Sequence, residues 1–417
     1  MRIWIANHYA APPHLGGITR HYELAQEWAA EEQAEVTLWL SSFNHTRRRR
    51  IRRAERDSVK TPGFRLRWLW SFPHTRNDFR RVLNMISFSF LFVLVGCFRR
   101  RPDLLLASSP HLLTPLAGWV LSKVKRCPFV LEVRDLWPDT LIQMNGLRNP
   151  LVIKALTRLE SFLYRRADQI IVLTEYQRKF IAAKGIPSHK ISLIPNGIVQ
   201  GSWHPRKSEK REYRRRMGVE SYRFVALYAG AHGPANALEH VVQAALDLPT
   251  GCAIVLIGDG PEKERLRQLK RERGLDHVYL LDPVPKEEIY HYIDAADCGV
   301  ITLADHEIFR GARPNKLFDY LYVGKPVITT VDGEVRQIVE ENGVGLFSGA
   351  ENSRGLAEAI EKLMTLSPEE RERIAEQGQR YIERFGDRRK LAKKLLREMK
   401  SLLYPGAKPI EEINRSG

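Results

Sequence analysis

Residues 311–328 read GARPNKLFDYLYVGKPVI, and this stretch decides the fold. Pro314 suits the start of a helix, and Lys316 and Asp319, three residues apart, share one face of that helix. A lysine at a helix N-terminus favours the binding of an anion. A carboxylate one turn later can accept hydrogen bonds from sugar hydroxyls. The segment therefore predicts a pocket for a nucleotide diphosphate, although an ordinary helix-strand unit with solvated charges would show the same pattern.

The rest of the chain repeats this alternation of helix and strand. Short β-branched runs alternate with helical stretches, which is typical of doubly wound parallel α/β domains. A chain of 417 residues is long for one core, so more than one domain is expected. Trp203-His204-Pro205 and the charged run 206–216 are interpreted as the seam between two halves. Strands are expected at 2–6, 35–40, 103–107, 129–133 and 169–173 in the first half, and at 224–229, 253–257, 277–281, 298–302 and 326–330 in the second.

Composition excludes several classes of protein. Hydrophobic residues make up 43% and charged residues 28% of the chain, which is typical of a globular protein and not of a disordered one. The four cysteines are far apart and lack the spacing of metal ligands or of a redox pair, which indicates a reducing cytosol. The first residues, MRIWIAN, read as a short strand and lack the features of a signal peptide.

The positive charge is concentrated in the first half of the chain. Residues 1–200 carry 31 Lys and Arg against 15 Asp and Glu, whereas residues 201–417 carry 35 against 34. Such asymmetry indicates an anionic partner for the first half, which could be a membrane surface, a nucleic acid or a polyanionic substrate. Nucleic acid is the least favoured of the three, because no known binding motif is visible.

An apolar stretch with basic flanks occupies residues 82–98. Arg80-Arg81 precede it and Arg99-Arg100-Arg101 follow it. Its length is at the lower limit for a membrane span, and Asn84 is among the polar residues that interrupt it. We expect a helix that lies in the membrane interface without spanning it, with an ordinary buried helix as the alternative.

Two glycine-rich loops precede predicted helices. Gly16-Gly17 lie between the first strand and a helix expected at about 19–30, and Gly230 and Gly233 follow the first strand of the second half. Such loops leave backbone N–H groups open at the start of a helix, which suits a phosphate, although a plain turn also uses glycine. Arg20, one turn into the first of these helices, could also face a phosphate.

A cluster of charges follows the strand expected at 129–133. The string EVRDLWPD, residues 132–139, places Arg134, Asp135 and Asp139 where that strand ends. Ligands bind at the carboxyl ends of the strands in doubly wound sheets. We therefore expect these side chains at a ligand site, and a salt-bridged loop around a core tryptophan is the alternative.

Residues 311–328 resemble the donor-binding segment of the family 4 retaining glycosyltransferases, which have the GT-B fold. The resemblance extends from about residue 1 to residue 400 through motifs in the same order. The string RDLWPD resembles a subgroup that adds N-acetyl-L-fucosamine or similar aminosugars during the assembly of surface polysaccharides. Besides the loops above, the matching motifs are LIPNGI at 193–198, IGDGPE at 257–262, PVP at 283–285 and AADCGVIT at 295–302.

The resemblance implies two Rossmann-like domains and a C-terminal helix that crosses back to the first. Residues 1–202 would form an acceptor-binding domain, and residues 203–380 would form a domain that binds the nucleotide sugar. Residues 381–404 would form the returning helix and residues 405–417 a tail.

The resemblance also implies roles for individual residues. Lys316 would stabilise the diphosphate and Asp319 would hold the ribose, while Arg134 and Asp135 would lie near the transferred sugar or the acceptor. No metal is expected, because this fold usually needs none. Arg20 and Asp139 are the further candidates for acceptor or sugar contacts, and Gly16, Gly17, Gly230, Gly233, Asn236, Val284 and Arg313 complete the expected donor-binding set.

The chain departs from the family pattern in two places. Many members carry two glutamates eight positions apart, where this chain has Gly311 and Asp319. Many also clamp the diphosphate with an arginine and a lysine, where this chain has Ala231-His232 and Asn236. Lys316, aided by backbone N–H groups and Arg313, would then carry more of the charge.

By this resemblance the expected activity is the retaining transfer of a sugar, an N-acetylated aminosugar, from a UDP-linked donor. The expected acceptor is a polyprenyl-diphosphate-linked glycan at the inner face of the cytoplasmic membrane, in the synthesis of O-antigen or capsule. The protein would be peripheral on that membrane. Two alternatives stay open: a nucleotide-sugar epimerase or hydrolase on the same fold, and a catalytically silent membrane adaptor.

Overall fold

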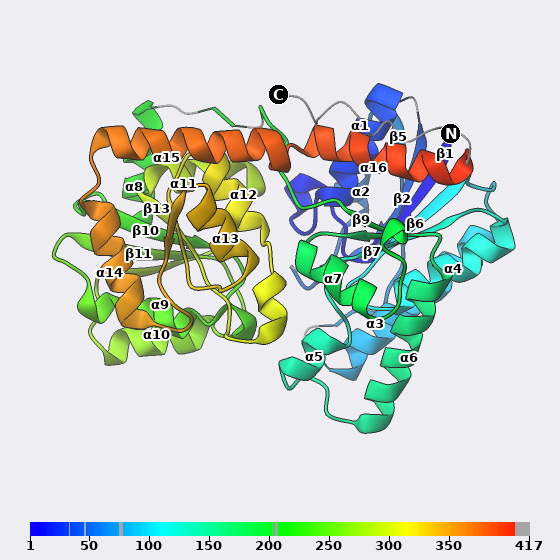
Figure 1. Cartoon of the computed structure of the whole chain (residues 1–417), viewed down its shortest axis with the longest axis horizontal. Coiled ribbons are helices and arrows are strands. Elements are labelled where there is room, and N and C mark those ends of the chain that lie inside the picture. The colour runs from blue at the N-terminus through cyan, green and yellow to red at the C-terminus, as the bar shows by residue number, and fades with distance from the viewer. Residues whose placement is uncertain (33, 46, 75–77, 202, 205–206, 405–417) are drawn as a thin grey trace.

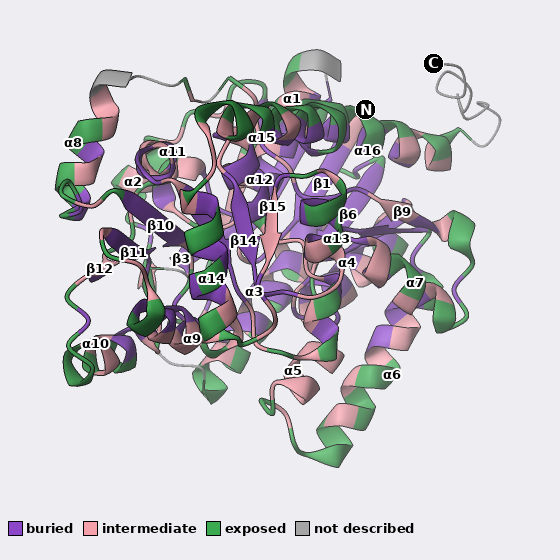
Figure 2. Cartoon of the chain, turned by 60° about the vertical axis from the view of Figure 1, so that its left-hand side comes forward, coloured by how far each residue is buried: buried purple, intermediate pink, exposed green. Residues whose placement is uncertain are grey.

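The computed structural model consists of two α/β domains joined by a long C-terminal helical segment (Figure 1). It describes residues 1–32, 34–45, 47–74, 78–201, 203–204 and 207–404. The predicted tail at 405–417 lies outside these residues. Figure 2 shows most strands of both sheets buried beneath helices whose outer faces are exposed, whereas the edge strand β15 is only partly buried.

The first domain is built on a parallel sheet of seven strands in the order β5-β2-β1-β6-β7-β8-β9. Apolar side chains on both faces of the sheet pack against helices, as expected for a parallel sheet. The strands are β1 (Arg2–Ala6), β2 (Glu35–Ser41), β5 (Phe64–Leu69), β6 (Leu104–Ser108), β7 (Phe129–Val133), β8 (Gln169–Val172) and β9 (Ile191–Leu193), beside a small hairpin of β3 (Phe43–Asn44) and β4 (Arg49–Arg50). The helices are η1 (Pro13–Leu15), α1 (Arg20–Glu32), α2 (Arg53–Asp57), α3 (Phe79–Cys97), α4 (Leu113–Lys125), α5 (Asp139–Gln143), α6 (Pro150–Arg166), α7 (Glu175–Ala183) and η2 (Ser188–Lys190).

The second domain repeats this arrangement with six parallel strands in the order β12-β11-β10-β13-β14-β15. Its strands are β10 (Phe224–Ala229), β11 (Cys252–Ile257), β12 (Val278–Leu281), β13 (Cys298–Ile301), β14 (Val327–Thr329) and β15 (Gly345–Phe347). Its helices are α8 (Lys207–Met217), η3 (Pro234–Asn236), α9 (Leu238–Gln243), η4 (Ala244–Asp247), α10 (Lys263–Glu272), α11 (Lys286–Ala295), η5 (Glu307–Gly311), α12 (Asn315–Tyr322), α13 (Glu334–Glu341) and α14 (Ser353–Met364).

Both sheets have a switch point, where the strand order reverses. In the first domain it lies between β1 and β6, and in the second between β10 and β13. Doubly wound sheets bind ligands beyond the carboxyl ends of the strands at such points. The predicted fold class is therefore confirmed, and its topology places one potential binding edge on each domain.

The C-terminal segment crosses from the second domain to the first. Helix α15 (Pro368–Tyr381), a turn of π-helix (Ile382–Gly386) and α16 (Arg388–Leu403) run end to end along one side of both domains (Figure 1). The Trp28 indole N–H donates to Ala392 O at 2.9 Å, and Arg388 pairs with Glu23 at 2.8 Å. The crossing expected from the family resemblance is therefore present, and apolar residues of α16 complete the core beside α1.

The interpretation of residues 206–216 as a seam was wrong for the part that the structure describes. Residues 207–216 lie in helix α8, whose Tyr213 and Met217 are buried in the core of the second domain. Arg214 anchors this helix through an ion pair with Asp297 at 2.6 Å. The run is charged because α8 exposes its other face to solvent, so charge alone was a misleading sign of a linker.

Helix α3 covers the apolar stretch that the sequence singled out. One face is buried through Asn84, Met85, Phe88, Phe92 and neighbouring small residues, and Leu121 of α4 packs against Gly96. By length and composition α3 could cross a membrane, and a third of its most apolar window is buried. A stripe on its other face is exposed: Phe79, Val82, Leu83, Ile86, Phe90 and Leu94, followed by Phe98 just beyond the helix.

Candidate functional site

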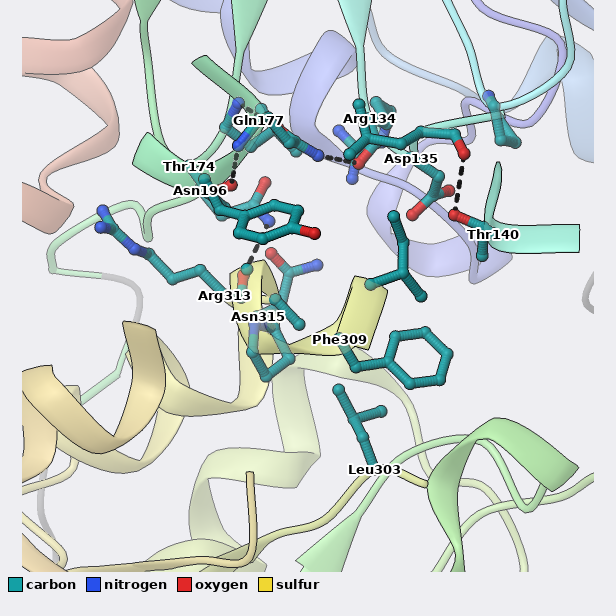
Figure 3. A pocket seen from close by; sticks show the side chains of 18 of the residues that line it. Arg134, Asp135, Thr140, Thr174, Gln177, Asn196, Leu303, Phe309, Arg313 and Asn315 are labelled. Atoms are coloured by element: carbon teal, nitrogen blue, oxygen red, sulfur yellow. Dashed lines mark hydrogen bonds between the residues drawn. The ribbon is translucent and has the colours of Figure 1, made fainter. Parts of the chain in front are cut away.

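A cavity of about 380 Å³ lies between the two domains, at the carboxyl ends of their strands (Figure 3). Its volume is within the range of small-molecule sites. The first domain contributes the segment after β7 and the start of α7, and the second contributes η5 and the turn into α12. The lining residues are Ile18, Pro110, Arg134, Asp135, Leu136, Thr140, Leu173, Thr174, Tyr176, Gln177, Asn196, Leu303, Ile308, Phe309, Gly311, Ala312, Arg313, Pro314 and Asn315.

Arg134 and Asp135 form part of the wall on the first domain, where the sequence predicted a ligand site. The backbone on both sides of Arg134 is fixed: its N–H donates to Ser109 Oγ at 2.8 Å, and its carbonyl accepts from Gln177 Nε2 at 2.8 Å. Within the described chain, Arg134 Nη1 is buried without a hydrogen-bond partner. The guanidinium therefore keeps donor capacity for a group entering the cavity.

Arg313 belongs to the wall on the second domain. Its Nη2 lies 3.3 Å from Glu334 Oε2, and Nε has no hydrogen-bond partner among the residues that the structure describes. Its carbonyl accepts from Asn196 Nδ2 of the first domain at 3.4 Å. The arginine is thus placed at the junction of the two domains, with part of its hydrogen-bonding capacity unused.

Lys316 follows this wall in the first turn of α12. Its Nζ lies 3.8 Å from the centre of the Tyr228 ring, and a Cβ on Gly230 would be 3.2 Å from it. Burial lowers the pKa of Lys316 to about 7. The structure therefore brings Lys316 and the second glycine loop together, and the bare backbone at Gly230 leaves room for the ammonium group.

The loop after β10 is packed tightly against the loop after β11. A Cβ on Gly258 would overlap Gly230 O, and a Cβ on Gly260 would overlap His232 O. His232 is fully buried, neither of its ring nitrogens has a partner in the described structure, and burial lowers its pKa to about 4. His232, in the loop where the family resemblance implies a pair of cations, is therefore uncharged at neutral pH. Gly233 and Asn236 lie in the short η3 turn that follows.

Asp319 has a partner that sequence reasoning missed. Lys286, at the start of α11, forms an ion pair with Asp319 Oδ1, and the Tyr290 hydroxyl lies 3.3 Å from the same oxygen. The proposed ribose contact would have to share this carboxylate with Lys286. The PVP motif just before Lys286 was the available signal, and its Val284 is packed, partly buried, against the core of the second domain.

The first glycine loop lies at a separate, smaller hollow. Gly16 and Gly17 line it together with His8, Tyr9 and other residues of the first domain, whereas Ile18 reaches the main cavity. Asn44 Nδ2 donates to the carbonyls of Leu15 and Gly16, each at 2.9 Å. These two hydrogen bonds from Asn44 hold the loop in place. Its glycines are not part of the wall of the main cavity.

Two of the predicted site residues are engaged elsewhere. Arg20 is buried, and its nitrogens donate to Glu132 Oε1, Pro195 O and Ile194 O at 2.7–3.0 Å. Asp139 pairs with Lys184 at 3.3 Å, and its neighbour Thr140 lines the cavity instead. The expectation that Arg20 faces a phosphate is therefore wrong, because its side chain is buried, each of its three nitrogens donates to a core partner, and it does not line the cavity.

Within the ranges that the structure describes, no three His, Cys, Asp or Glu side chains are grouped so as to hold a metal ion. The charged residues that line the cavity are Arg134, Asp135 and Arg313.

Two family models match the chain, one on each domain. The model described as "Glycosyl transferase 4-like domain" matches residues 16–197, and that described as "Glycosyl transferases group 1" matches residues 209–381. Among curated proteins, Escherichia coli (strain K12) WcaI, named as a glycosyl transferase of colanic acid biosynthesis, is 23% identical over 85% of this chain and 90% of its own length. The 2-deoxystreptamine N-acetyl-D-glucosaminyltransferase of Streptomyces fradiae is 24% identical over 88% and 91%.

Solved structures share the fold at low sequence identity. Anabaena HepE, solved in complex with UDP and glucose, superposes with a TM-score of 0.74 at 18% identity, over 96% of this chain and 100% of the other. WaaG, described as a glycosyltransferase involved in lipopolysaccharide biosynthesis, superposes with a TM-score of 0.67 at 14% identity, over 97% and 100%.

Proposed function

Because the chain belongs to the family 4 glycosyltransferases of the GT-B fold, we propose that it transfers a sugar from a UDP-sugar to a polyprenyl-diphosphate-linked glycan. The proposed pathway is the synthesis of a cell-surface polysaccharide such as O-antigen or capsule, and the proposed sugar is an N-acetylated aminosugar such as N-acetylfucosamine. The observation that carries the proposal is Lys316, which lies beside Gly230 at the switch point of the second sheet.

Related proteins support the choice of donor and pathway. HepE was solved with UDP, and WcaI is named for the synthesis of a surface polysaccharide. The Streptomyces fradiae relative is named as an N-acetylglucosaminyltransferase, which agrees with an N-acetylated sugar. In this chain RDLWPD, the string that suggested the aminosugar subgroup, contributes Arg134, Asp135 and Leu136 to the cavity wall.

The proposed chemistry is transfer with retention of configuration. The leaving diphosphate would take the proton of the attacking acceptor hydroxyl on the same face of the sugar, so no side chain needs to act as nucleophile. The contribution of the protein is then to stabilise the charge that develops on the diphosphate, which positioned cations in a partly buried site do effectively. Lys316 is the cation at the diphosphate, no bound metal is invoked, and Arg134 and Arg313 are placed to assist at the cavity.

The function is tested with a panel of labelled UDP- and GDP-sugars, with and without short polyprenyl-diphosphate glycans. Transfer that requires the lipid acceptor and a UDP-sugar supports the proposal and identifies the sugar. Conversion of the donor without lipid would establish an epimerase or hydrolase in its place. Binding of lipid vesicles with no turnover of any donor would favour the silent adaptor.

Donor binding is expected to weaken as pH rises through the pKa of Lys316. The pKa is about 7 because of burial, and a bound diphosphate would raise it by favouring the ammonium form. Affinity is therefore full below about pH 7 and falls by up to roughly tenfold per pH unit above it, until the pKa of the complex is reached. Calorimetric titration with UDP-glucose, whose phosphates do not titrate in this range, measures the effect.

Lys316→Arg provides the matched control for this pH dependence, because an arginine stays charged throughout the range. Its affinity for UDP-glucose should be flat with pH. A wild-type affinity that is equally flat would rule out Lys316 as the titrating group at the diphosphate.

We propose in addition that the protein is peripheral on the inner face of the cytoplasmic membrane and docks through α3. The exposed stripe of α3 ends beside Arg99, Arg100 and Arg101, which are themselves exposed. Apolar side chains on one face with cations at the boundary are typical of a helix that lies in the membrane interface. Each cation near an anionic leaflet contributes about 1 kcal/mol, less at high salt.

Replacing Ile86 and Phe90 together by serine is expected to weaken binding to phosphatidylglycerol vesicles by about tenfold or more, because both side chains are exposed and apolar. Co-sedimentation measures the effect. Leu246→Ser, at an exposed leucine of the second domain, is the control and should bind as the wild type does. Equal binding by all three proteins would exclude α3 as the docking helix.

A further inference from the structure

Tyr176 belongs to the first domain, yet it completes the cavity wall of the second. It lies in the first turn of α7 and lines the cavity together with Gly311, Ala312 and Arg313. A Cβ placed on Gly311 would overlap atoms Cβ, Cγ and Cδ1 of Tyr176. The backbone of Gly311 is not in the left-handed region, so it is the tyrosine that excludes a side chain at this position.

A carboxylate of the second domain holds this turn of α7 in place. Glu334 Oε1 accepts hydrogen bonds from the backbone N–H groups of Glu175 at 2.5 Å and Tyr176 at 3.1 Å. Its other oxygen lies 3.3 Å from Arg313 Nη2, and the side chains of Glu334 and Arg313 are only 11% and 13% exposed. A carboxylate at a helix N-terminus is favourable, and here it comes from the opposite domain.

The segment that carries Gly311 is also seated in the first domain. Ile308 and Phe309 of η5 pack in the hydrophobic cluster of the first domain, and the Ile308 N–H donates to Gln143 Oε1 at 2.9 Å. The wall around Tyr176 is therefore made by both domains together.

We propose that Tyr176 positions the transferred sugar, its ring standing in the space that a side chain at position 311 would occupy. The inference rests on the proposed function: with the diphosphate at Lys316, the sugar extends toward residues 311–313 and Arg134, into the cavity that Tyr176 lines. The ring offers a flat apolar surface to the C–H groups of a pyranose, and aromatic side chains are common in the lining of small-molecule sites. The hydrogen bonds from the N-terminus of α7 to Glu334 hold the ring in this place.

Binding of two nucleotides tests this inference, because UDP lacks the sugar. In Tyr176→Ala, the ratio of the Kd of UDP-N-acetylglucosamine to the Kd of UDP is expected to rise about tenfold. Such a rise corresponds to a loss of about 1.4 kcal/mol in the binding free energy of UDP-N-acetylglucosamine alone. Tyr176→Phe keeps the ring and should leave the ratio within about twofold of the wild type. Phe180→Ala is the matched control, because Phe180 stacks near Tyr176 on the same helix but does not line the cavity.

An unchanged ratio in Tyr176→Ala overturns the inference, even if both nucleotides bind more weakly, because a merely structural tyrosine would affect both equally. A wild-type protein that binds neither nucleotide would instead refute the proposed function.

The contact with Gly311 gives a second, independent measurement. Gly311→Ala is expected to raise the same ratio about tenfold in the wild-type background, because the new methyl group displaces the ring. In a Tyr176→Gly background, which also removes the overlapping Cβ, the same substitution should add less than about twofold, since the two residues are in contact. Equal effects in both backgrounds would show that Tyr176 does not act at position 311.

Discussion

Lys316→Ala is expected to lower kcat/KM for sugar transfer by about 10- to 150-fold, which corresponds to ~1.5–3 kcal/mol of charge-assisted hydrogen bonding. The loss is large because the neighbouring loop offers little other charge. Ala231 and His232 occupy the loop where many relatives have a cation, and the low pKa of His232 leaves it neutral. Lys316 Nζ lies beside the bare backbone of Gly230, so its ammonium group places a positive charge directly at this loop.

Lys325→Ala is the matched control for Lys316→Ala. Lys325 is also a buried lysine of the second domain, with a pKa lowered to about 8 by burial, but its Nζ donates to Asp294 O at 2.7 Å and pairs with Asp294 Oδ1. Its removal should lower the Tm and leave the KM for the donor unchanged. Near-normal turnover by Lys316→Ala at saturating donor, with the control also active, would remove Lys316 from the diphosphate site.

Local sequence determined much of the donor segment. As expected, α12 begins directly after a proline and ends before a Gly-Lys-Pro turn, which is followed by the strand β14. These signals could be read from the sequence because they act over only a few residues. Strand β5 was missed although Phe64, Leu66 and Trp68 alternate with Arg65 and Arg67. It is an edge strand, and the arginines that make it look like a loop are typical of exposed edges.

The partners within the site could not be read from the sequence. Lys286 meets Asp319 across 33 positions, and Tyr176 meets Gly311 across the domain interface. Such pairs depend on how helices are placed over the sheet and on how the domains close, which no local pattern encodes. In the sequence, Gly311 was a departure from the family pattern of two carboxylates, whereas in the structure the glycine makes room for the side chain of Tyr176.

Arg20 is a second residue whose partner could not be predicted from the sequence. An arginine after a glycine loop is placed well for a phosphate, but Arg20 instead donates a hydrogen bond to Glu132, 112 positions away, inside the core. His21 binds the second oxygen of Glu132, and Ser108 Oγ donates to it at 2.6 Å. The contacts of Arg20 and His21 with Glu132 therefore join α1 to β7 inside the first domain. Arg134 follows in the segment just after β7.

Glu132→Ala is expected to lower the free energy of unfolding of the first domain by about 3–5 kcal/mol, because it leaves the buried Arg20 charge without its counterion. Burial alone would raise the pKa of Glu132, but His21 and Arg20 outweigh it and hold the pKa well below its ordinary value, so the carboxylate is ionised at neutral pH. Urea unfolding followed by tryptophan fluorescence reports on this domain, since seven of the eight tryptophans precede residue 202.

The control is Asp57→Ala, which breaks the exposed ion pair of Asp57 with Arg53 on α2 of the same domain and should cost less than about 1 kcal/mol. The sign of the pH dependence follows from the depressed pKa of Glu132: its contribution is complete above the ordinary pKa of a glutamate and is lost as pH falls through the lower value of the folded state. The difference in stability between wild type and Glu132→Ala should therefore narrow in acid. A small difference at neutral pH would mean that water reaches Arg20 once Glu132 is gone, and that the core of the first domain is more open than its burial indicates.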